Sequence, residues 1–298
     1  MKLPAQRSQA LMFVLPALAV FGLFVLYPMA ATFVMSLFSW KAMSPERHWV
    51  GLNNYAQLLR DPVFFICLKN NGLWIVLSLA VQLPIALLLA VALSGGPGRV
   101  QWLRAAFFTP FVLPIVAVAL VWWVIFEPNF GLARAVVGLL AGLVHQGQPR
   151  TIAWLGDPRL ATLSIIAVAC WRYLGFHMMV MLAGLQAIAP EYYEAAILDG
   201  ATPWRVFRHV TLPLMRRIIL VDALLIVVGS VKVFELIWVM TGGGPHHVSE
   251  VLATYMYYCG FTIDRMGYSA ALASIMVVLT LAATAAYLRM AAVEPEEV

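Results

Sequence analysis

Six long apolar stretches dominate this sequence and decide what it can fold into. Each holds roughly 20 mostly uncharged residues, the length that an α-helix needs to cross a bilayer core of about 30 Å. Backbone amides find no water there, so a span must satisfy its hydrogen bonds internally. We therefore predict an all-α integral membrane protein, a single transmembrane domain over residues 1–298, with six helices near residues 11–38, 72–93, 105–126, 161–185, 218–240 and 268–288.

Composition supports the membrane assignment and excludes several functions. Hydrophobic residues make up 63% of the chain and charged residues only 11%, too few charges to cover a soluble domain. The net charge of +5 is ordinary for a membrane protein and does not indicate nucleic acid. Neither an HExxH metal pattern nor a GxxxxGKS/T nucleotide loop occurs, and the 3 cysteines are widely separated. We expect no metal, no cofactor and no enzymatic activity in the chain itself.

Two features of the apolar stretches admit a second interpretation. Pro84, Pro110 and Pro114 lie inside predicted spans, where we expect kinks rather than lost spans because neighbouring helices re-satisfy the freed backbone groups. Residues 1–31 are also compatible with a cleaved secretory signal. Their apolar stretch is longer than the usual signal core, so we expect a retained first helix.

One polar segment, residues 190–213, interrupts the apolar sequence. Pro190 can occupy the first turn of a helix, and Gly200 can end it in the left-handed conformation. Thr202 and Pro203 predict the N-cap and first residue of a second short helix, which Pro213 should end. The sequence predicts a helix-turn-helix hairpin, acidic in its first half and basic in its second. The charge pattern alone fits either a solvated loop or a surface that contacts another protein.

Residue identities in this hairpin favour a specific partner. Glu194-Ala195-Ala196, followed by Gly200 and by Leu212-Pro213, resembles the EAA signature of permease subunits in binding-protein-dependent ABC importers. Four other segments are similar to the carbohydrate-uptake branch of that family, in the same order along the chain: VGLNNY, RAAFFTPFVLP, WLGDP and TGGGP. The outer loops and TGGGP resemble the MalF-like partner of a permease pair.

The resemblance implies a type I permease fold, in which the hairpin between the fourth and fifth spans is a coupling helix seated in a cytoplasmic ATPase. It also implies partners: a second permease in a pseudo-twofold heterodimer, two ATP-binding subunits that hydrolyse the ATP, an extracytoplasmic solute-binding protein, and membrane lipid. The implied function is uptake of a sugar or oligosaccharide by alternating access. The implied ATPase-coupling residues are Glu191, Glu194, Ala195, Ala196, Asp199, Gly200, Leu212 and Pro213.

The hairpin also sets the expected orientation. An ATPase partner exists only in the cytoplasm, and an even number of spans then places both termini there. Basic residues are slightly denser in the segments that this topology puts inside, as the positive-inside rule requires. We expect a multi-pass protein of the cytoplasmic (inner) membrane of a bacterium or archaeon.

The charged residues Arg172, Lys232 and Glu235 fall inside predicted spans, where a bilayer makes charge costly. On one helix, Lys232 and Glu235 would share a face and could pair. One interpretation is that pair plus a locally satisfied arginine. The other is a pocket between the fourth and fifth spans, the location of the membrane pocket in maltose-type importers, with polar groups and aromatic planes suited to a sugar. The candidate substrate-path residues are Trp171, Arg172, Tyr173, Phe176, His177, Ser230, Lys232, Phe234 and Glu235.

Two other transporter classes stay open. A permease for another solute, such as glycerol phosphate, an amino acid or an osmolyte, would share the EAA signature. An ion-coupled secondary transporter would also place charges at the bilayer midplane. That class predicts inverted repeats and broken helices, and it leaves the hairpin unexplained.

Overall fold

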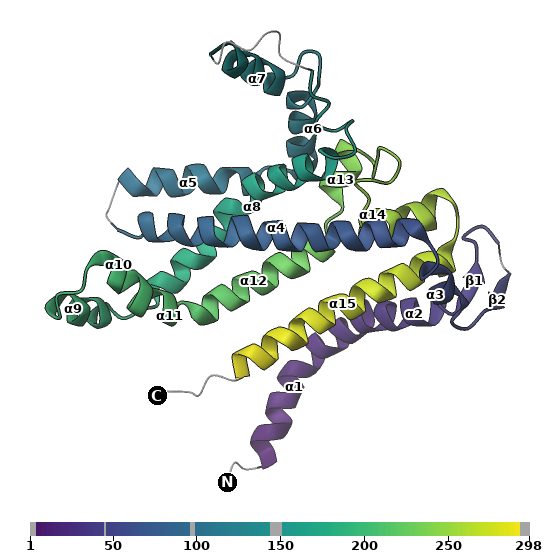
Figure 1. Ribbon diagram of the computed structural model, residues 1–298. Coiled ribbons are helices and arrows are strands. Elements are labelled where there is room, and N and C mark those ends of the chain that lie inside the picture. The colour runs from purple at the N-terminus through teal and green to yellow at the C-terminus, as the bar shows by residue number, and fades with distance from the viewer. Residues whose placement is uncertain (1–3, 45, 96–98, 144–150, 293–298) are drawn as a thin grey trace. The chain divides into compact units, whose positions relative to one another are not determined.

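The computed structural model describes residues 4–44, 46–95, 99–143 and 151–292, which are predominantly helical (Figure 1). The chain divides into two compact units. The first unit comprises Met1–Asp61 and Met256–Val277, and the second comprises Pro62–Tyr255 and Val278–Val298. Each unit is described by itself.

The first unit contains a small strand pair between its helices. Its elements are α1 (Pro4–Phe21), a π-helical turn (Gly22–Leu26), α2 (Tyr27–Met35), β1 (Phe38–Trp40), β2 (Arg47–Trp49), α3 (Asn53–Leu58), a second π-helical turn (Tyr258–Thr262) and the first part of α15 (Met266–Ala292). The strands are antiparallel, with Phe38 opposite Trp49. The side-chain amide of Asn54, in the VGLNNY segment, donates to the carbonyls of Ser36 at 2.7 Å and Phe38 at 3.0 Å. This motif therefore fixes the strand pair to α3.

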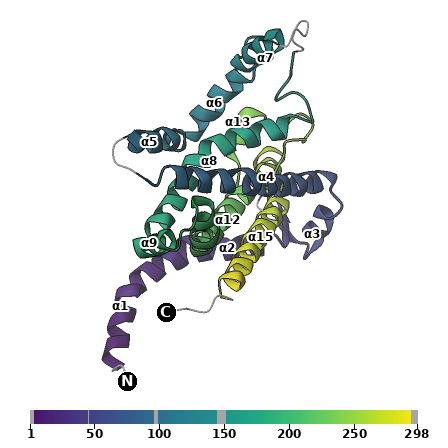
Figure 2. The same cartoon turned by 60° about the vertical axis from the view of Figure 1, so that its left-hand side comes forward.

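The second unit is a helical bundle. Its main elements are α4 (Pro62–Ala92), α5 (Arg99–Val112), α6 (Ile115–Ile125), α7 (Leu132–Leu143), α8 (Ala161–Gln186), α12 (Arg216–Val231) and α13 (Glu235–Met240), and α14 (Leu252–Tyr257) begins in it. Helix α8 packs against α4 and α5, while α12 packs against α4 and α8, as both Figure 1 and Figure 2 show.

Two glycines set the close packing of α8. A Cβ atom on Gly175 would collide with the backbone carbonyl of Phe107, so α5 crosses α8 directly at this residue. A Cβ on Gly184 would lie 2.8 Å from Cγ1 of Ile218 on α12. Small residues allow this approach of helix backbones in membrane bundles. Side chains of α4, α8 and Met215 complete the buried core near the hairpin.

Two of the predicted spans are broken. Helices α5 and α6 meet at 93° across Leu113 and Pro114, and the carbonyl of Leu113 accepts a 2.8 Å hydrogen bond from Nη2 of Arg172. Helix α12 ends at Val231 and α13 begins at Glu235. Asn71 of α4 donates to the carbonyl of Ser230 at 2.8 Å. Side chains of neighbouring helices thus satisfy backbone groups that each break frees.

The helices of the structure coincide with the predicted spans in some places and differ from them in others. Helices long and apolar enough to cross a membrane cover Met12–Met35, Pro62–Ala92, Ala161–Gln186 and Met266–Ala292, and the bent pair Gln101–Val112 and Ile115–Ile125 could add a fifth span. The expected continuous helix over 218–240 is wrong, because residues 232–234 leave helical geometry. The second span begins at Pro62 rather than at 72. The count of six stays a prediction.

Candidate functional site

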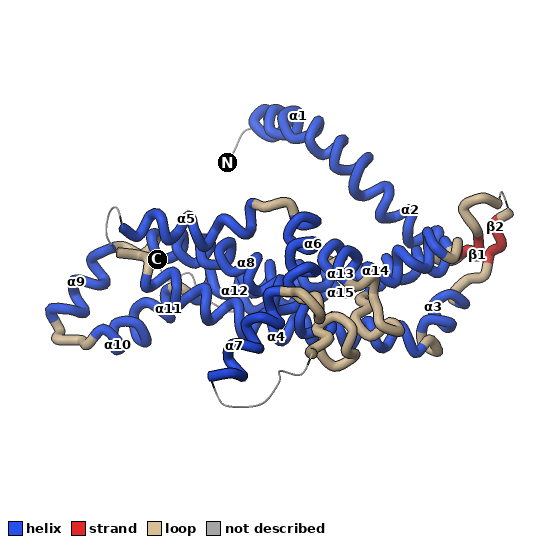
Figure 3. Tube along the Cα trace, turned by 90° about the horizontal axis from the view of Figure 1, so that it is seen from above, coloured by secondary structure: helices blue, strands red, loops and turns tan. Residues whose placement is uncertain are grey.

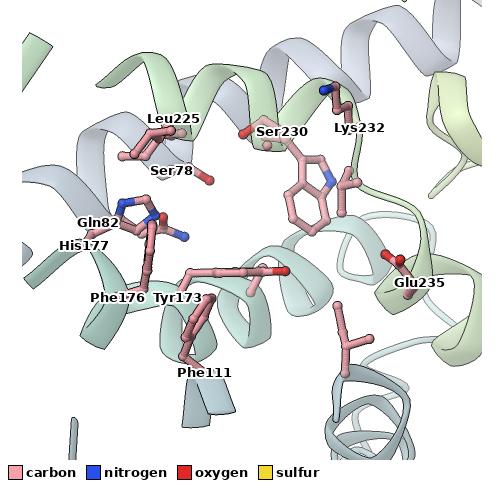
Figure 4. A pocket seen from close by; sticks show the side chains of 16 residues that line it. Ser78, Gln82, Phe111, Tyr173, Phe176, His177, Leu225, Ser230, Lys232 and Glu235 are labelled. Carbon is pink, nitrogen blue, oxygen red and sulfur yellow. The ribbon is translucent and has the colours of Figure 1, made fainter. Parts of the chain in front are cut away.

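A cavity of about 330 Å³ lies within the second unit, where α12 gives way to α13. Helices α4, α5, α8, α12 and α13 all contribute to its wall, as Figure 4 shows. The volume is at the lower end of the range for small-molecule sites. The lining side chains that carry its chemistry are Trp74, Ser78, Gln82, Phe111, Tyr173, Phe176, His177, Ser230, Lys232 and Glu235.

One wall of the cavity is aromatic. The ring of Phe111 stacks on Phe176 with centroids 4.8 Å apart and lies 5.9 Å from the ring of Tyr173. Ser78 and Gln82 on α4 add polar groups to the lining, and Gln82 lies beside His177 (Figure 4). Such a combination can hold an apolar ring face while hydrogen-bonding its edge.

The predicted substrate-path residues on α8 separate into two groups. Tyr173, Phe176 and His177 line the cavity, whereas Trp171 is 43% exposed and packs edge-on against Trp122, 5.4 Å away. Phe176 and His177 follow Tyr173 by three and four residues, so the three side chains share one face of the helix. Trp171 precedes Tyr173 by only two residues and therefore points in another direction. Periodicity therefore brings three of these side chains together and turns Trp171 away.

Arg172 contacts the broken helix rather than the cavity. Besides the hydrogen bond from Nη2 to the Leu113 carbonyl, its guanidinium lies 5.0 Å from the Tyr173 ring centre and 5.6 Å from that of Phe111. Arg172 is not among the described residues that line the cavity. This geometry favours an arginine held by the break, although its Nε is buried and has no hydrogen-bond partner among the described residues.

The fifth predicted span places its candidates around the break. Ser230, Lys232 and Glu235 line the cavity. The expectation that Lys232 and Glu235 share one helix is wrong, because one follows the last residue of α12 and the other starts α13. Within the described residues no ion pair joins them. Phe234 stacks on Trp238 at 5.6 Å and is not one of the described lining residues.

Sequence reasoning missed Trp74 and four further contributors to this region. Ser78 and Gln82 are polar residues four apart on α4, so they share a face. Phe111 lies in the last turn of α5, and Asp222 lies within α12. A carboxylate inside an apolar stretch was an available signal for Asp222. Its Oδ1 lies 2.8 Å from Nδ1 of His177.

Residues 190–213 form the expected helix-turn-helix, with α9 (Pro190–Leu198), α10 (Pro203–Val206), a π-helical turn (Phe207–Thr211) and α11 (Leu212–Leu214) (Figure 3). Gly200 has φ of +73°, and Thr202 precedes α10 in extended conformation. The prediction that Pro213 ends the second helix is wrong. The amide of Leu212 bonds the carbonyl of Phe207, five residues back, and this wider turn accommodates a following residue that has no amide hydrogen.

The hairpin exposes both its charges and its large apolar side chains. Glu191, Glu194 and Asp199 are exposed. Leu198 is 88% exposed and Trp204 65%. The predicted coupling residues Ala195, Ala196, Leu212 and Pro213 lie on the same segment, with Ala196 only half-buried. Exposed apolar side chains rimmed by charge are typical of a protein-contact surface.

Two loops of the second unit have ordered carboxylates. In the TGGGP loop, Oε2 of the buried Glu250 lies 2.9 Å from Nδ1 of His247. After α6, the backbone amide of Phe130, helped by that of Asn129, donates to Glu127 and lowers the pKa of this carboxyl below its ordinary value. Both carboxylates hold turns outside the long helices.

A family model described as "Binding-protein-dependent transport system inner membrane component" matches residues 82–292, which include the hairpin and most of the cavity wall. The chain belongs to this family of ABC importer permeases, and the predicted family and all-α membrane fold are confirmed.

Individual relatives match along almost the whole chain. The probable ABC transporter permease protein YurN of Bacillus subtilis (strain 168) is 39% identical over 274 residues, covering 91% of both chains. The lactose transport system permease protein LacF of Rhizobium radiobacter is 32% identical over 273 residues, covering 91% of this chain and 89% of the relative. A crystal structure of a bacterial ABC transporter involved in the import of the acidic polysaccharide alginate contains a chain with a TM-score of 0.77 and 25% identity, covering 95% of this chain and 96% of that one.

Proposed function

We propose that this protein is the permease subunit through which an ABC importer takes up a sugar or oligosaccharide by alternating access. The observation that carries the proposal is the cavity at the α12–α13 break, with an aromatic wall and polar edge, in the bundle that also holds the hairpin. The name of LacF supports a carbohydrate as cargo. Broken helices lining a midplane site are a common transporter design.

The cavity wall matches the chemistry of a sugar ring. The stacked Phe111 and Phe176 offer a flat apolar face, while Gln82, His177 and Ser230 offer hydrogen-bonding groups. The indole nitrogen of Trp74 is buried and has no hydrogen-bond partner within the described residues. Tyr173, Lys232 and Glu235 complete the proposed substrate path.

The hairpin is proposed to couple this cavity to ATP hydrolysis in a partner subunit. Its exposed Leu198 and Trp204 would enter a cleft of the ATPase, and Glu194 would pair with a basic group there. The hairpin directly joins α8 to α12, which both line the cavity, so its displacement would move them as rigid bodies. The other partners are a second permease, a second ATP-binding subunit and an extracytoplasmic binding protein. Both termini would lie in the cytoplasm.

Uptake by cells that express the complete importer tests the cargo class. Wild type should accumulate radiolabelled lactose, trehalose or maltose, and only with an intact ATPase subunit. Phe176→Ala should lower uptake per permease roughly two- to tenfold, because about 0.5–1.5 kcal/mol of ring stacking is lost. Met179→Ala is the matched control, since Met179 lies on the same helix, is 39% exposed and is not one of the described lining residues. Uptake of glycerol phosphate or an amino acid instead of sugars would refute the carbohydrate assignment.

The coupling role has a separate test. Glu194→Lys should abolish both uptake and cargo-stimulated ATP hydrolysis while the permease remains in the membrane, because a reversed charge would meet the basic group of the ATPase. Glu194→Gln keeps the shape and should retain more of both activities. Normal uptake by Glu194→Lys would exclude this contact, and uptake independent of ATP would favour an ion-coupled transporter.

A further inference from the structure

His177 on α8 and Asp222 on α12 form a buried polar pair beside the cavity. Nδ1 of His177 lies 2.8 Å from Oδ1 of Asp222, and the two side chains are 6% and 0% exposed. Among the described residues, His177 is part of the cavity wall and Asp222 is not. Asp222 can therefore influence the cavity through the imidazole ring in front of it.

The burial of Asp222 limits the charge that the pair can carry. Its second oxygen, Oδ2, is sealed from solvent and has no hydrogen-bond partner within the part of the chain that the structure describes. An uncompensated carboxylate inside a membrane-embedded bundle is strongly disfavoured. His177 is in contact and can balance it, so we expect a pair that is neutral overall.

A neutral pair holds two protons, and they can be arranged in two ways. In one, His177 is an imidazolium that donates from Nδ1 to the Asp222 carboxylate, and Nε2 also carries a proton. In the other, Asp222 is a carboxylic acid that donates to Nδ1 of a neutral ring, whose own proton is then on Nε2. Nε2 is an N–H donor in both arrangements. Only a negatively charged pair, with a single proton on Nδ1, would leave Nε2 as an acceptor.

We propose that Asp222 is a positioning residue that orients the His177 ring and keeps Nε2 protonated, so that His177 presents a hydrogen-bond donor to an acceptor oxygen of the cargo. Figure 4 shows the ring beside Gln82 at the cavity wall. The bond to Asp222 is the one hydrogen bond that the His177 side chain makes within the described residues, which leaves Nε2 for a ligand. The cargo contact rests on the proposed function, whereas the protonation of Nε2 does not.

This donor would contribute to the choice of substrate. A hydroxyl or ring oxygen accepts a hydrogen bond from N–H, while an ammonium group has no lone pair to offer. A site that presents a donor rejects a ligand that lacks the matching acceptor, because its own polar group then stays unpaired. The pair therefore favours oxygen-rich neutral or anionic cargo over amines.

The protonation state is tested without any cargo. The full permease, labelled with [15N]histidine and reconstituted in lipid nanodiscs, should give a protonated-nitrogen signal for Nε2 of His177, assigned by its loss in His177→Gln. In Asp222→Leu the signal should become a mixture of protonated and unprotonated nitrogen, and Asp222→Asn should do the same if the leucine variant does not assemble. An unprotonated Nε2 in the wild type, or spectra unchanged in both Asp222 variants, would overturn the proposal.

The effect on recognition is measured by uptake of whichever of lactose, trehalose or maltose the wild type imports. His177→Gln and Asp222→Leu should each lower uptake per permease roughly tenfold or more, because removing one partner leaves a buried polar group without its hydrogen bond. Combining them should cost no more than His177→Gln alone, because Asp222 acts through the ring. A further tenfold loss in the double variant would make Asp222 a structural residue only.

A packing control separates these outcomes from general damage. Gly184→Ala presses on Ile218, at another contact between α8 and α12, and leaves the pair itself unchanged. This variant should reduce the amount of folded permease but not the uptake per permease. If the wild type imports none of the three sugars, the proposed cargo class fails, while the nitrogen spectra still decide whether Asp222 sets the proton on His177.

Discussion

Gly175 is the residue at which the structure makes its sharpest stability prediction, because α5 and α8 touch there through backbone atoms. A Cβ on Gly175 would lie 2.5 Å from the carbonyl carbon of Phe107 and 2.8 Å from Cα of Phe108, besides colliding with the Phe107 oxygen. Backbone atoms of a helix cannot rotate away as a side chain can. Gly175→Ala must therefore push the two helices apart.

The size of the effect follows from that displacement. Carbon atoms in contact prefer roughly 3.5–4.0 Å, so α5 has to move by about 1 Å. Overpacking of a fixed core costs about 1–3 kcal/mol. The same movement stretches the 2.8 Å hydrogen bond by which Arg172 satisfies the Leu113 carbonyl at the break between α5 and α6, and losing it adds about 1–3 kcal/mol. We expect a total loss of about 2–6 kcal/mol in the free energy of unfolding.

Reversible unfolding of the permease in mixed micelles measures this loss, and a matched variant supplies the control. Gly72 on α4 has nothing within 4 Å of its Cβ position, so Gly72→Ala should be neutral or stabilise by up to about 1 kcal/mol through helix propensity. The prediction concerns the difference between two identical substitutions. If both variants unfold alike, the contact between α5 and α8 is not the one described, and the wall formed by Phe111 and Phe176 loses its support.

Three further predictions test other parts of the chain. Gly200→Val should destabilise the hairpin by about 1–2 kcal/mol. The cost comes from the backbone angle φ of +73° alone, since a Cβ there meets no neighbouring atom, and Gly200→Asn should therefore be tolerated. The solvent accessibility of a cysteine placed at Leu198 reports the difference between the two variants. Arg172→Met should leave the Leu113 carbonyl unpaired and lower stability by about 1–3 kcal/mol in the same unfolding assay, without changing cargo preference if the arginine acts only on the break. Folding lowers the pKa of Glu127, so the contribution of this carboxylate to stability is complete above the ordinary carboxyl pKa and disappears as the pH falls through the lowered pKa. A 13C titration, with Glu127→Gln for assignment, should give this carboxyl a pKa below that of a free glutamate.

The hairpin could be predicted in detail because its signals are local. Pro190 and Pro203 restrict their own backbone angles, and Gly200 permits a positive φ. The structure has a helix start, a positive φ and a second helix start at Pro190, Gly200 and Pro203 respectively. Pro213 was misjudged for a reason that is not local. A π-helical turn over Phe207–Thr211 alters the hydrogen-bond register before the proline, and single residues carry no signal for that register.

The sequence locates the apolar segments, but it does not show where a helix within such a segment is broken. Hydropathy measures solvent preference, and a half-helix followed by a bend is as apolar as a straight helix. Whether Pro114 bends a helix gently or breaks it depends on a partner for the freed carbonyl of Leu113. That partner is Arg172, 59 residues later in the sequence. Helical periodicity alone could have predicted which face of α8 lines the cavity, because Tyr173 and His177 lie on one face and Trp171 does not.

The break between α12 and α13 explains the two charges that looked like a pair in the sequence. Lys232 follows the C-terminal end of α12, where the helix dipole favours a cation, and Glu235 begins α13, where the helix dipole favours an anion. Each charge is thus stabilised by its own helix end and needs no ion partner. Both side chains then remain available at the cavity, which is why a broken helix supplies polar chemistry to an apolar bundle. Broken helices therefore do not distinguish an ion-coupled transporter from this family of ATP-driven permeases.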